Sequence, residues 1–409
     1  MSEFIYILIL IIVIFDFIFE RGLDYLNIKH LHPTLPKTLK GIYDQESYKK
    51  SQQYIKENHI LSLYSSSAIF LAVLLLLIFK GFGELDIWVG NITSNSYLQT
   101  LLFYGILGLG MEILSLPFQI YDTFIIEERY GFNKTTTKTF VFDKIKGLFI
   151  TAIIGGGILL FLQWAFLEGG TLFWIISLVG ISIIVLFFTI FYTSLILPLF
   201  NKLKPLEEGE LKDAIESFAK KAGFSLSRIY IIDGSKRSTK ANAFFSGLGP
   251  RKTIILYDTL MEQLNPQEIV AVLAHEIGHY KKKHIYKGLL LSLVQITIMI
   301  LILWWTLSNP EFAMALGGTK SSFPLALLAF ALLYSPISFI LGLIMNVFSR
   351  KHEYEADAFA GSFGLAENLI QALIKLSVKS LSNLDPHPLY VFFHYSHPTL
   401  LQRKEQLKN

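Results

Sequence analysis

The sequence of 409 residues contains no cysteine and few charged residues. Without cysteine the chain can form neither a disulfide nor a thiolate metal site, and it has no cysteine nucleophile. Any metal must therefore be bound by His, Asp or Glu. Only 17% of the residues are charged, against about a quarter in soluble proteins, which argues against an ordinary cytosolic enzyme. The hydrophobic content of 52% excludes disorder, and the net charge of +4 gives no case for binding nucleic acid.

Long apolar runs account for the low charge content. A bilayer core about 30 Å thick needs roughly 20 apolar residues in a helix. We expect seven spans, near residues 4–19, 61–79, 100–120, 148–166, 172–197, 286–306 and 323–347. The first is short and contains Asp16, but it has neither a basic leading region nor a small-residue cleavage site. We therefore interpret it as a retained span and not as a signal peptide.

Lysine and arginine indicate the orientation of these spans. Of the 36 basic residues, all but Lys80, Lys287 and Lys320 lie in the four alternate connections 20–60, 121–147, 201–284 and 349–409. The positive-inside rule places these connections in the cytoplasm and the N-terminus outside. We expect four parts: helices one to five with their loops (1–200), a first polar block (201–285), helices six and seven (286–348), and a second polar block with the tail (349–409).

The first polar block predicts a small α/β unit. Residues 210–222 have helical periodicity, and 228–233 and 253–257 are strand-like runs rich in Ile and Tyr. A third strand is predicted at 241–249. Residues 265–268 read NPQE, which is typical of a helix start with Asn as N-cap, Pro in the first turn and Glu at N3.

That helix contains a metal-binding pattern, because residues 275–279 read HEIGH. His275 and His279 are four residues apart and share one helix face, so both imidazoles can bind one zinc ion. Glu276 lies about 100° round the helix and can take a proton from a water at the metal as general base. A buried structural pair of histidines is the alternative interpretation.

A catalytic zinc site uses three protein ligands and one open position. Residues 349–360, just after the last predicted span, read SRKHEYEADAFA. Glu353 and Asp357 share one helix face there, whereas Glu355 points nearly the opposite way. Glu353 fits as the third ligand, with Asp357 accepting the outer N–H of a ligating histidine. The same spacing also fits a solvated, charged helix end.

Together these motifs resemble the CAAX prenyl protease type 1 family, which are integral-membrane zinc peptidases of the gluzincin group. The resemblance covers essentially the whole chain, with seven spans, HEIGH before span six and SRKHEYEADAFA after span seven in the same order. Further family-like strings are EERYGFN (127–133), GSKRSTKANAFF (234–245) and HYSHP (394–398).

The resemblance implies one zinc ion held by His275, His279 and Glu353, with Glu276 as the general base. It implies that Asp357 is the carboxylate usually described as a proton donor, although on physical grounds we favour a role in positioning a histidine. It also implies that Asn242 and His397 contact the substrate backbone, and that His397 steadies the oxyanion.

The implied fold is mainly α, with seven transmembrane helices around a water-filled chamber, capped by a cytoplasmic zinc protease domain with a small sheet. Asp16 and Glu112, which lie inside predicted spans, either face this chamber or pair at a helix interface.

The predicted function is hydrolysis of prenylated or hydrophobic membrane-associated peptides by a membrane zinc endopeptidase. We expect a monomer in a bacterial cytoplasmic membrane or, alternatively, the ER membrane. Two other functions fit less well: a quality-control membrane metalloprotease, which usually has about four spans, and a transporter with a structural zinc site, which often shows internal repeats that are not apparent here.

Overall fold

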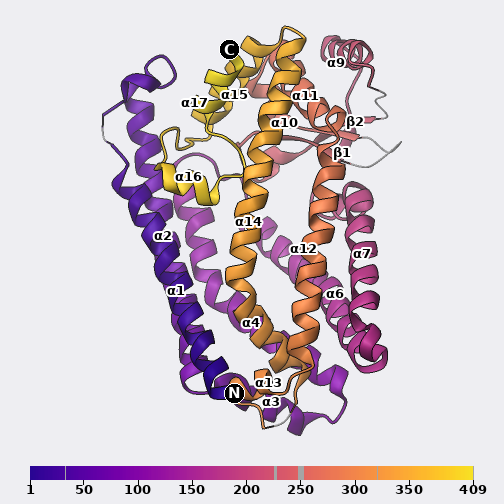
Figure 1. Ribbon diagram of the computed structural model, residues 1–409. Coiled ribbons are helices and arrows are strands. Elements are labelled where there is room, and N and C mark those ends of the chain that lie inside the picture. The colour runs from indigo at the N-terminus through magenta and orange to yellow at the C-terminus, as the bar shows by residue number, and fades with distance from the viewer. Residues whose placement is uncertain (33, 225–227, 247–252, 320, 409) are drawn as a thin grey trace.

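Long helices dominate the computed structural model, which describes residues 1–32, 34–224, 228–246, 253–319 and 321–408 (Figure 1). The mainly helical fold class is confirmed, and six continuous apolar helical stretches are long enough to cross a membrane. The helices that contain the seven predicted spans are α1 (Ser2–Lys29), α2 (Gln45–Ile78), α4 (Ser96–Tyr121), α6 (Thr137–Gly169), α7 (Phe173–Leu195), α12 (His284–Leu307) and α14 (Phe323–Ser362).

One of the six stretches, Thr137–Phe200, is 64 residues long and contains both α6 and α7. A single helix of that length would extend about 96 Å, roughly three times the thickness of a bilayer core. Instead the chain turns at Gly170, whose φ of +51° is a backbone conformation that glycine adopts readily. α6 and α7 then pack against each other. That all seven helices cross the membrane stays a prediction.

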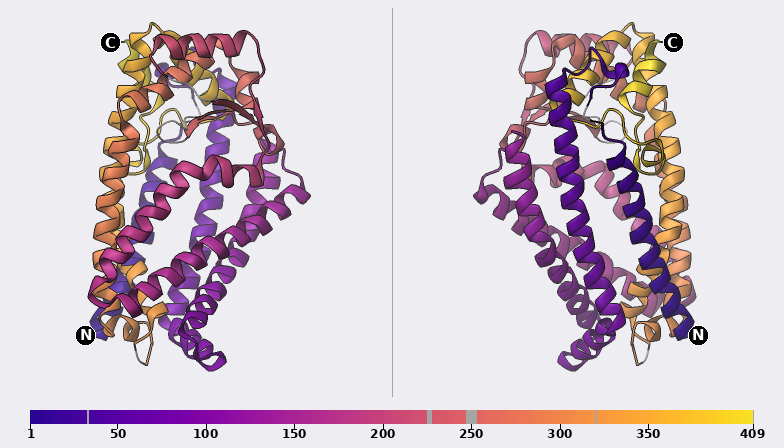
Figure 2. Two further views of the ribbon diagram at one scale, coloured as in Figure 1. Left: turned by 90° about the vertical axis from the view of Figure 1, so that its right-hand side faces the viewer. Right: turned by 90° about the vertical axis from the view of Figure 1, so that its left-hand side faces the viewer.

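The long helices stand around a common axis, and shorter segments close both ends (Figure 2). At the end that holds the N-terminus, a buried apolar cluster joins the seven long helices to α3 (Gly81–Ile92) and α13 (Glu311–Ala315). Along their length the long helices expose large apolar side chains such as Ile183 and Phe149. Such a surface suits hydrocarbon better than water.

Asp16 and Glu112 pair with neighbouring helices. Asp16 on α1 accepts a hydrogen bond from Ser335 on α14, and Glu112 on α4 forms an ion pair of 3.0 Å with Lys144 on α6. Of the two expectations, the structure therefore shows pairing at helix interfaces.

The opposite end of the molecule carries a four-stranded sheet of order β1-β2-β4-β3. β2 (Arg228–Ile232) and β4 (Thr253–Tyr257) correspond to two of the predicted strands, and they pair in parallel. β3 (Ala243–Ser246) is an edge strand antiparallel to β4 and falls in the third predicted strand, of which residues 247–249 lie outside the described part. The sequence did not predict β1 (Leu203–Pro205).

Helices pack on this sheet or connect the sheet end to the long helices. They are α9 (Glu210–Lys221), α10 (Asp258–Gln263), α11 (Pro266–Lys281), α15 (Ala366–Lys379), α16 (Pro388–His394) and α17 (Leu400–Lys408). Two buried clusters join Leu273 of α11 to Ala372 of α15, and Ile277 of α11 to Ala360 of α14. The two polar blocks, which helices α12 and α14 separate in sequence, thus share one packed core.

α14 links the two parts of the molecule most directly. Its apolar half belongs to the ring of long helices, and the same helix continues without a break through the polar residues 348–362 to the sheet end (Figure 1). Because an unbroken helix is stiff, side chains near its polar end have fixed positions relative to the membrane helices.

Candidate metal centre

The helix α11 has a well-defined start. The side chain of Asn265 accepts a hydrogen bond from the backbone N–H of Glu268, and the Glu268 carboxylate accepts one from the N–H of Asn265. This reciprocal pair is the capping box that the sequence predicts. Glu268 is also buried and forms an ion pair of 2.6 Å with Lys375 on α15. Both interactions fix the position of α11 in the domain.

Gly278 brings α11 unusually close to α14. A Cβ atom added at Gly278 would lie 3.0 Å from the Cα of Ala356 and 3.1 Å from its carbonyl oxygen. Any larger residue at position 278 would therefore push the two helices apart. The close crossing places Glu353, less than one helical turn before Ala356, within reach of the two histidines of α11.

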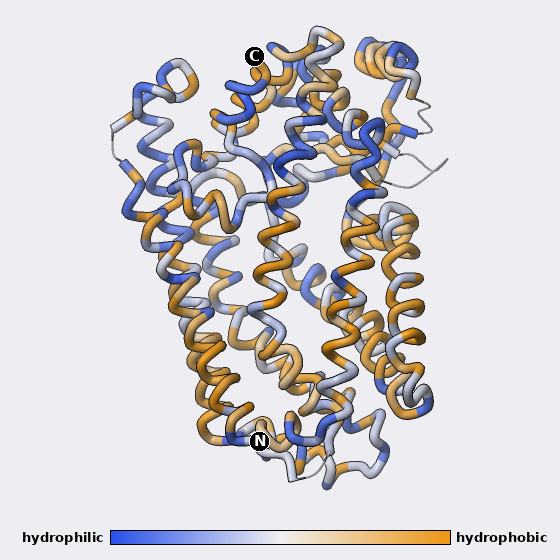
Figure 3. Tube along the Cα trace, in the orientation of Figure 1, coloured by the Kyte–Doolittle hydropathy of each residue, from blue (hydrophilic) through white to orange (hydrophobic). Residues whose placement is uncertain are grey.

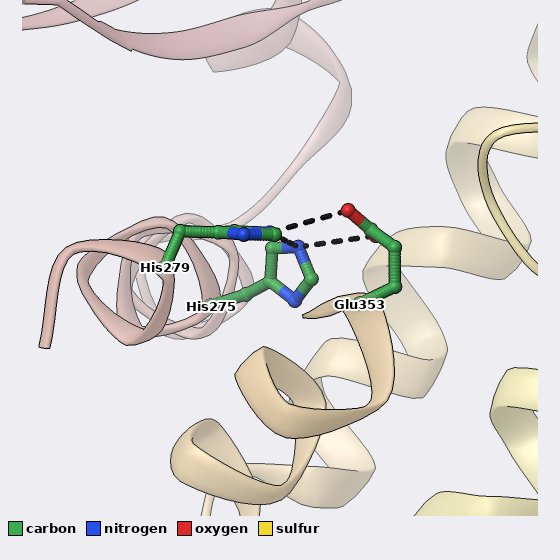
Figure 4. A group of neighbouring side chains, drawn as sticks. All are labelled: His275, His279 and Glu353. Carbon is green, nitrogen blue, oxygen red and sulfur yellow. Dashed lines mark hydrogen bonds and ion pairs between the residues drawn. The ribbon is translucent and has the colours of Figure 1, made fainter. Parts of the chain in front are cut away.

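The side chains of His275, His279 and Glu353 converge in the space between the two helices (Figure 4). Nε2 of His275 and Nε2 of His279 are 3.1 Å apart. Oε2 of Glu353 lies 3.4 Å from Nε2 of His275, and Oε1 lies 3.2 Å from Nε2 of His279. Two imidazole nitrogens and the two oxygens of one carboxylate, from two helices, thus lie close together, and the residues predicted as metal ligands form one group.

The outer nitrogen of His275 is held by Asp357 and Arg403. Nδ1 of His275 lies 2.8 Å from Oδ1 of Asp357, whose side chain is fully buried. Arg403 on α17 donates two hydrogen bonds to Asp357, of 2.9 and 2.6 Å. The guanidinium keeps Asp357 ionised, so the carboxylate can fix the ring of His275 as a hydrogen-bond acceptor. Sequence reasoning did not identify Arg403, since no motif marks it.

The outer nitrogen of His279 is also held, in this case by His284 and Glu355. Its Nδ1 lies 3.0 Å from Nδ1 of His284, and Nε2 of His284 lies 3.0 Å from Oε2 of Glu355. The ring of His284 also stacks on His352, with 3.9 Å between their centroids. Sequence reasoning did not identify His284, and it left Glu355 without a role. His275 and His279 are therefore each oriented by a side chain that is itself held by a further residue.

The electrostatics of the site favour a bound cation. Two buried carboxylates, Glu353 and Asp357, share a single guanidinium, that of Arg403. Burial alone lowers the pKa of His275, but hydrogen bonds to Asp357 and Glu353 raise it overall to about 9. Oε2 of Glu353 is buried and has no hydrogen-bond partner among the described residues. A buried carboxylate with one oxygen that accepts no hydrogen bond, beside two imidazoles, is a donor set that fits a divalent metal ion.

Glu276 lies on the same helix beside this group. Burial raises its pKa above the usual value, more than the nearby His275 and His279 lower it. Within the described part of the chain, its carboxylate makes no hydrogen bond. A carboxylate with a raised pKa that is free to accept a proton has the properties of a general base.

His397 and Asn242 lie at different distances from the metal group. Nε2 of His397 is 3.4 Å from Oε1 of Glu353, although the His397 side chain is 64% exposed. Asn242 lies just before the edge strand β3, with an exposed side chain, and its carbonyl accepts a hydrogen bond from the N–H of Tyr257. The described structure shows no contact between Asn242 and the metal group. β3 itself packs beside α11.

The segment that precedes Asn242 is anchored to the membrane helices by a clamp, which consists of residues 131–135 and 237–240. Backbone hydrogen bonds join Lys134 to Arg237 and Thr239 to Phe132, each at 3.0 Å. The ammonium of Lys240 binds Glu127 at 2.8 Å and lies 4.6 Å above the Phe132 ring. Two family-like strings in the sequence, 127–133 and 234–245, therefore pack against each other.

Comparisons with known proteins agree with this geometry. The family model described as the CAAX prenyl protease N-terminal region with five membrane helices matches residues 24–202, and that of peptidase family M48 matches residues 205–409. A CAAX prenyl protease 1 homolog from Arabidopsis thaliana is 36% identical over 95% of this chain and 93% of its own length. CAAX prenyl protease 1 of Saccharomyces cerevisiae is 35% identical over 95% and 92%.

The fold also matches a solved structure over nearly its full length. The crystal structure of S. mikatae Ste24p superposes with a TM-score of 0.93, covers 99% of both chains and is 34% identical in sequence. The chain therefore belongs to peptidase family M48 and, within it, to the CAAX prenyl protease 1 family of multi-span membrane metalloendopeptidases.

Proposed function

We propose that this metalloendopeptidase uses one zinc ion, held by His275, His279 and Glu353, to cleave prenylated or other hydrophobic peptides at the membrane. The main support for this proposal is the spacing of the donor atoms. Ligands at the Zn–N distance of about 2.0–2.1 Å in a tetrahedron lie about 3.3 Å from one another. The two imidazole nitrogens are 3.1 Å apart, that of His279 lies 3.2 Å from Oε1 of Glu353, and that of His275 lies 3.4 Å from Oε2, so the spacing is of the size that one metal ion requires.

The peptide is bound as an extended strand. Because β3 is at the edge of the sheet in the described part of the chain, its outward backbone groups can pair with a substrate strand, and Asn242 at its start adds a side-chain amide. Zinc, when bound, polarises the scissile carbonyl and lowers the pKa of water near the site. His397 donates a hydrogen bond toward the oxygen on which negative charge develops.

Glu276 is the residue that transfers the proton. Its carboxylate takes the proton from the attacking water and then delivers it to the leaving amine. Asp357 and Arg403 keep His275 in one orientation throughout, and no covalent intermediate with the protein forms. Asp357 is therefore a positioning residue in this proposal, because its two oxygens are already occupied by His275 and Arg403.

The membrane part supports the proposed substrate and orientation. A catalytic centre at the end of a ring of membrane helices suits a peptide that carries a lipid or an apolar segment. The distribution of lysine and arginine supports a cytoplasmic metal centre and C-terminus, which a reporter fused to the C-terminus tests. We propose that the protein acts as a monomer in a bacterial cytoplasmic membrane, or in the ER membrane if its source is eukaryotic.

Peptide cleavage by the purified protein in detergent tests this function. A farnesylated CAAX peptide and its unprenylated twin are compared, with and without a zinc chelator. We expect cleavage that the chelator abolishes and readdition of zinc restores, with a higher kcat/KM for the farnesylated peptide. Equal rates for both peptides would indicate a general membrane endopeptidase, and cleavage that survives full metal removal would contradict the zinc mechanism.

The clamp gives a separate prediction about substrate binding. In Lys240→Met the ion pair with Glu127 is lost, and the segment before Asn242 loses one anchor. We expect KM to rise roughly tenfold, the equivalent of about 1.4 kcal/mol, with little change in kcat. The double variant Glu127→Lys/Lys240→Glu restores an ion pair and should recover most of the loss. Lys212→Met, which breaks a surface ion pair between Lys212 on α9 and Glu208, is the control.

A further inference from the structure

We propose that a groove between α2 and α4 binds one anionic phospholipid. The groove, called here the interfacial groove, consists of two adjoining cavities of about 580 and 480 Å³. The larger cavity is lined mainly by apolar and aromatic side chains, namely Ile60, Leu61, Tyr64, Phe118, Tyr121 and Ile126. The smaller cavity is lined by Lys50, Lys56 and Arg129 among others, and the two share Glu57, Ile60 and Arg129.

One face of α2 forms the full length of this groove. Lys50, Gln53, Glu57, Leu61 and Tyr64 are spaced by three or four residues and therefore lie on one side of the helix. Along α2 the residues change from hydrophilic to hydrophobic, as the colouring of this helix in Figure 3 shows. From Lys50 to Tyr64 the helix rises about 21 Å, which is the thickness of one bilayer leaflet with its headgroups, roughly 20–22 Å.

The opposite wall is kept open by two irregularities of the backbone. Pro117 lies inside α4, where it provides no N–H for the helix and its ring crowds the preceding turn. A π-helical segment, η2 (Asp122–Ile126), then separates α4 from α5 (Glu127–Arg129). π-Helical turns are rare and are frequent at functional sites. A regular helix here would present a different face toward α2.

The charges at the polar end select the headgroup. Glu57 accepts hydrogen bonds from Arg129 at 2.7 Å and from the hydroxyl of Tyr130 at 3.1 Å, so its negative charge is compensated. Lys50 and Lys56 are exposed and have no ion pair within the described part of the chain. Two free ammonium groups beside an apolar cavity therefore match a phosphate with attached acyl chains.

The aromatic residues of the groove support the same depth in the membrane. The side chains of Tyr64 and Tyr121 are 64% and 47% exposed and come from opposite walls. Tyrosine is enriched at the level of the lipid headgroups, where its ring lies in apolar surroundings and its hydroxyl remains wet. The basic end of the groove is at the same end of the molecule as the metal centre (Figure 1).

Native mass spectrometry of the detergent-purified chain tests the proposal, with dioleoyl phosphatidylglycerol and dioleoyl phosphatidylcholine offered in equal amounts. We expect one retained phosphatidylglycerol with about tenfold preference, and loss of this preference in Lys50→Gln/Lys56→Gln. The matched control is Lys40→Gln/Lys49→Gln, which removes the same charge from exposed positions that do not line the groove. Leu61→Trp, which fills the apolar cavity, should abolish retention of both lipids.

Two results would overturn the proposal. One is equal retention of the two lipids by the unaltered chain, and the other is a preference that Lys50→Gln/Lys56→Gln keeps as fully as its control. A farnesylated peptide serves as competitor. If it displaces the phospholipid at equimolar concentration in the unaltered chain, and Leu61→Trp no longer binds the farnesylated peptide, the groove is a site for the substrate's isoprenoid and the phospholipid assignment is wrong.

Discussion

Replacing Glu276 with glutamine should remove nearly all peptidase activity while zinc remains bound. Glutamine has almost the same shape but cannot accept the proton of the attacking water or return one to the leaving amine. The loss of a positioned general base typically lowers kcat by roughly 10²- to 10⁴-fold. Because no metal ligand is altered, we expect one zinc per chain by elemental analysis and an unchanged thermal unfolding midpoint in detergent.

The control for this variant is Glu405→Gln on α17, which removes an exposed carboxylate near Arg403 and should leave kcat unchanged. Activity within threefold of the unaltered protein in Glu276→Gln would show that another group takes the proton. Loss of zinc together with activity would mean that Glu276 helps to hold the metal, and the roles of the HEIGH residues would need to be reassigned.

The parts of the site that depend on local pattern were predictable from the sequence. HEIGH places two imidazoles on one face of α11 by helical geometry alone, and the capping residues Asn265 and Glu268 mark where that helix begins. Seven apolar runs likewise correspond to the seven long helices. Each of these features depends only on residues that are near one another in the sequence. Their spacing is therefore enough to predict them.

The predicted role of Glu353 as third ligand depends on a contact between segments that are distant in the sequence. Spacing alone therefore could not decide whether Glu353 has this role. Glu353 fits both a metal ligand and the end of a solvated helix. The structure shows its side chain buried against α11 because Gly278 and Ala356 allow the two helices to approach closely. The helix also continues beyond the apolar residues, since the Arg, Lys, Glu and Ala of 350–360 are good helix formers. Hydropathy predicts only the span and not this extension.

Arg403 and His284 could not be found by motif because their roles arise only in three dimensions. Arg403 is one basic residue among several in a polar tail, and only its burial beside Asp357 distinguishes it. His284 follows the lysine run 281–283 just before a predicted membrane span, and no motif links it to His279. A buried carboxylate requires a cationic partner, so the prediction of Asp357 implies that some basic residue lies beside it. The sequence does not indicate which basic residue that is.

Replacing Glu353 with alanine should strip the metal from the protein. Two imidazoles four residues apart remain, but the third donor and the buried negative charge are both lost. Removing an outer partner of a ligand costs roughly 10- to 100-fold in metal affinity. Removal of a ligand itself should cost more than 100-fold, and peptidase activity should fall with it. Competition with a chromogenic zinc chelator measures the affinity directly.

A graded series separates loss of a ligand from a general loss of structure. Arg403→Gln leaves all three donors in place and should weaken zinc binding by the intermediate 10- to 100-fold, because Asp357 then holds His275 less firmly. Glu353→His supplies a new donor at the same position and should recover part of the affinity. Glu367→Ala, on the exposed face of α15, should have no effect. Full zinc affinity in Glu353→Ala would remove this residue from the metal centre.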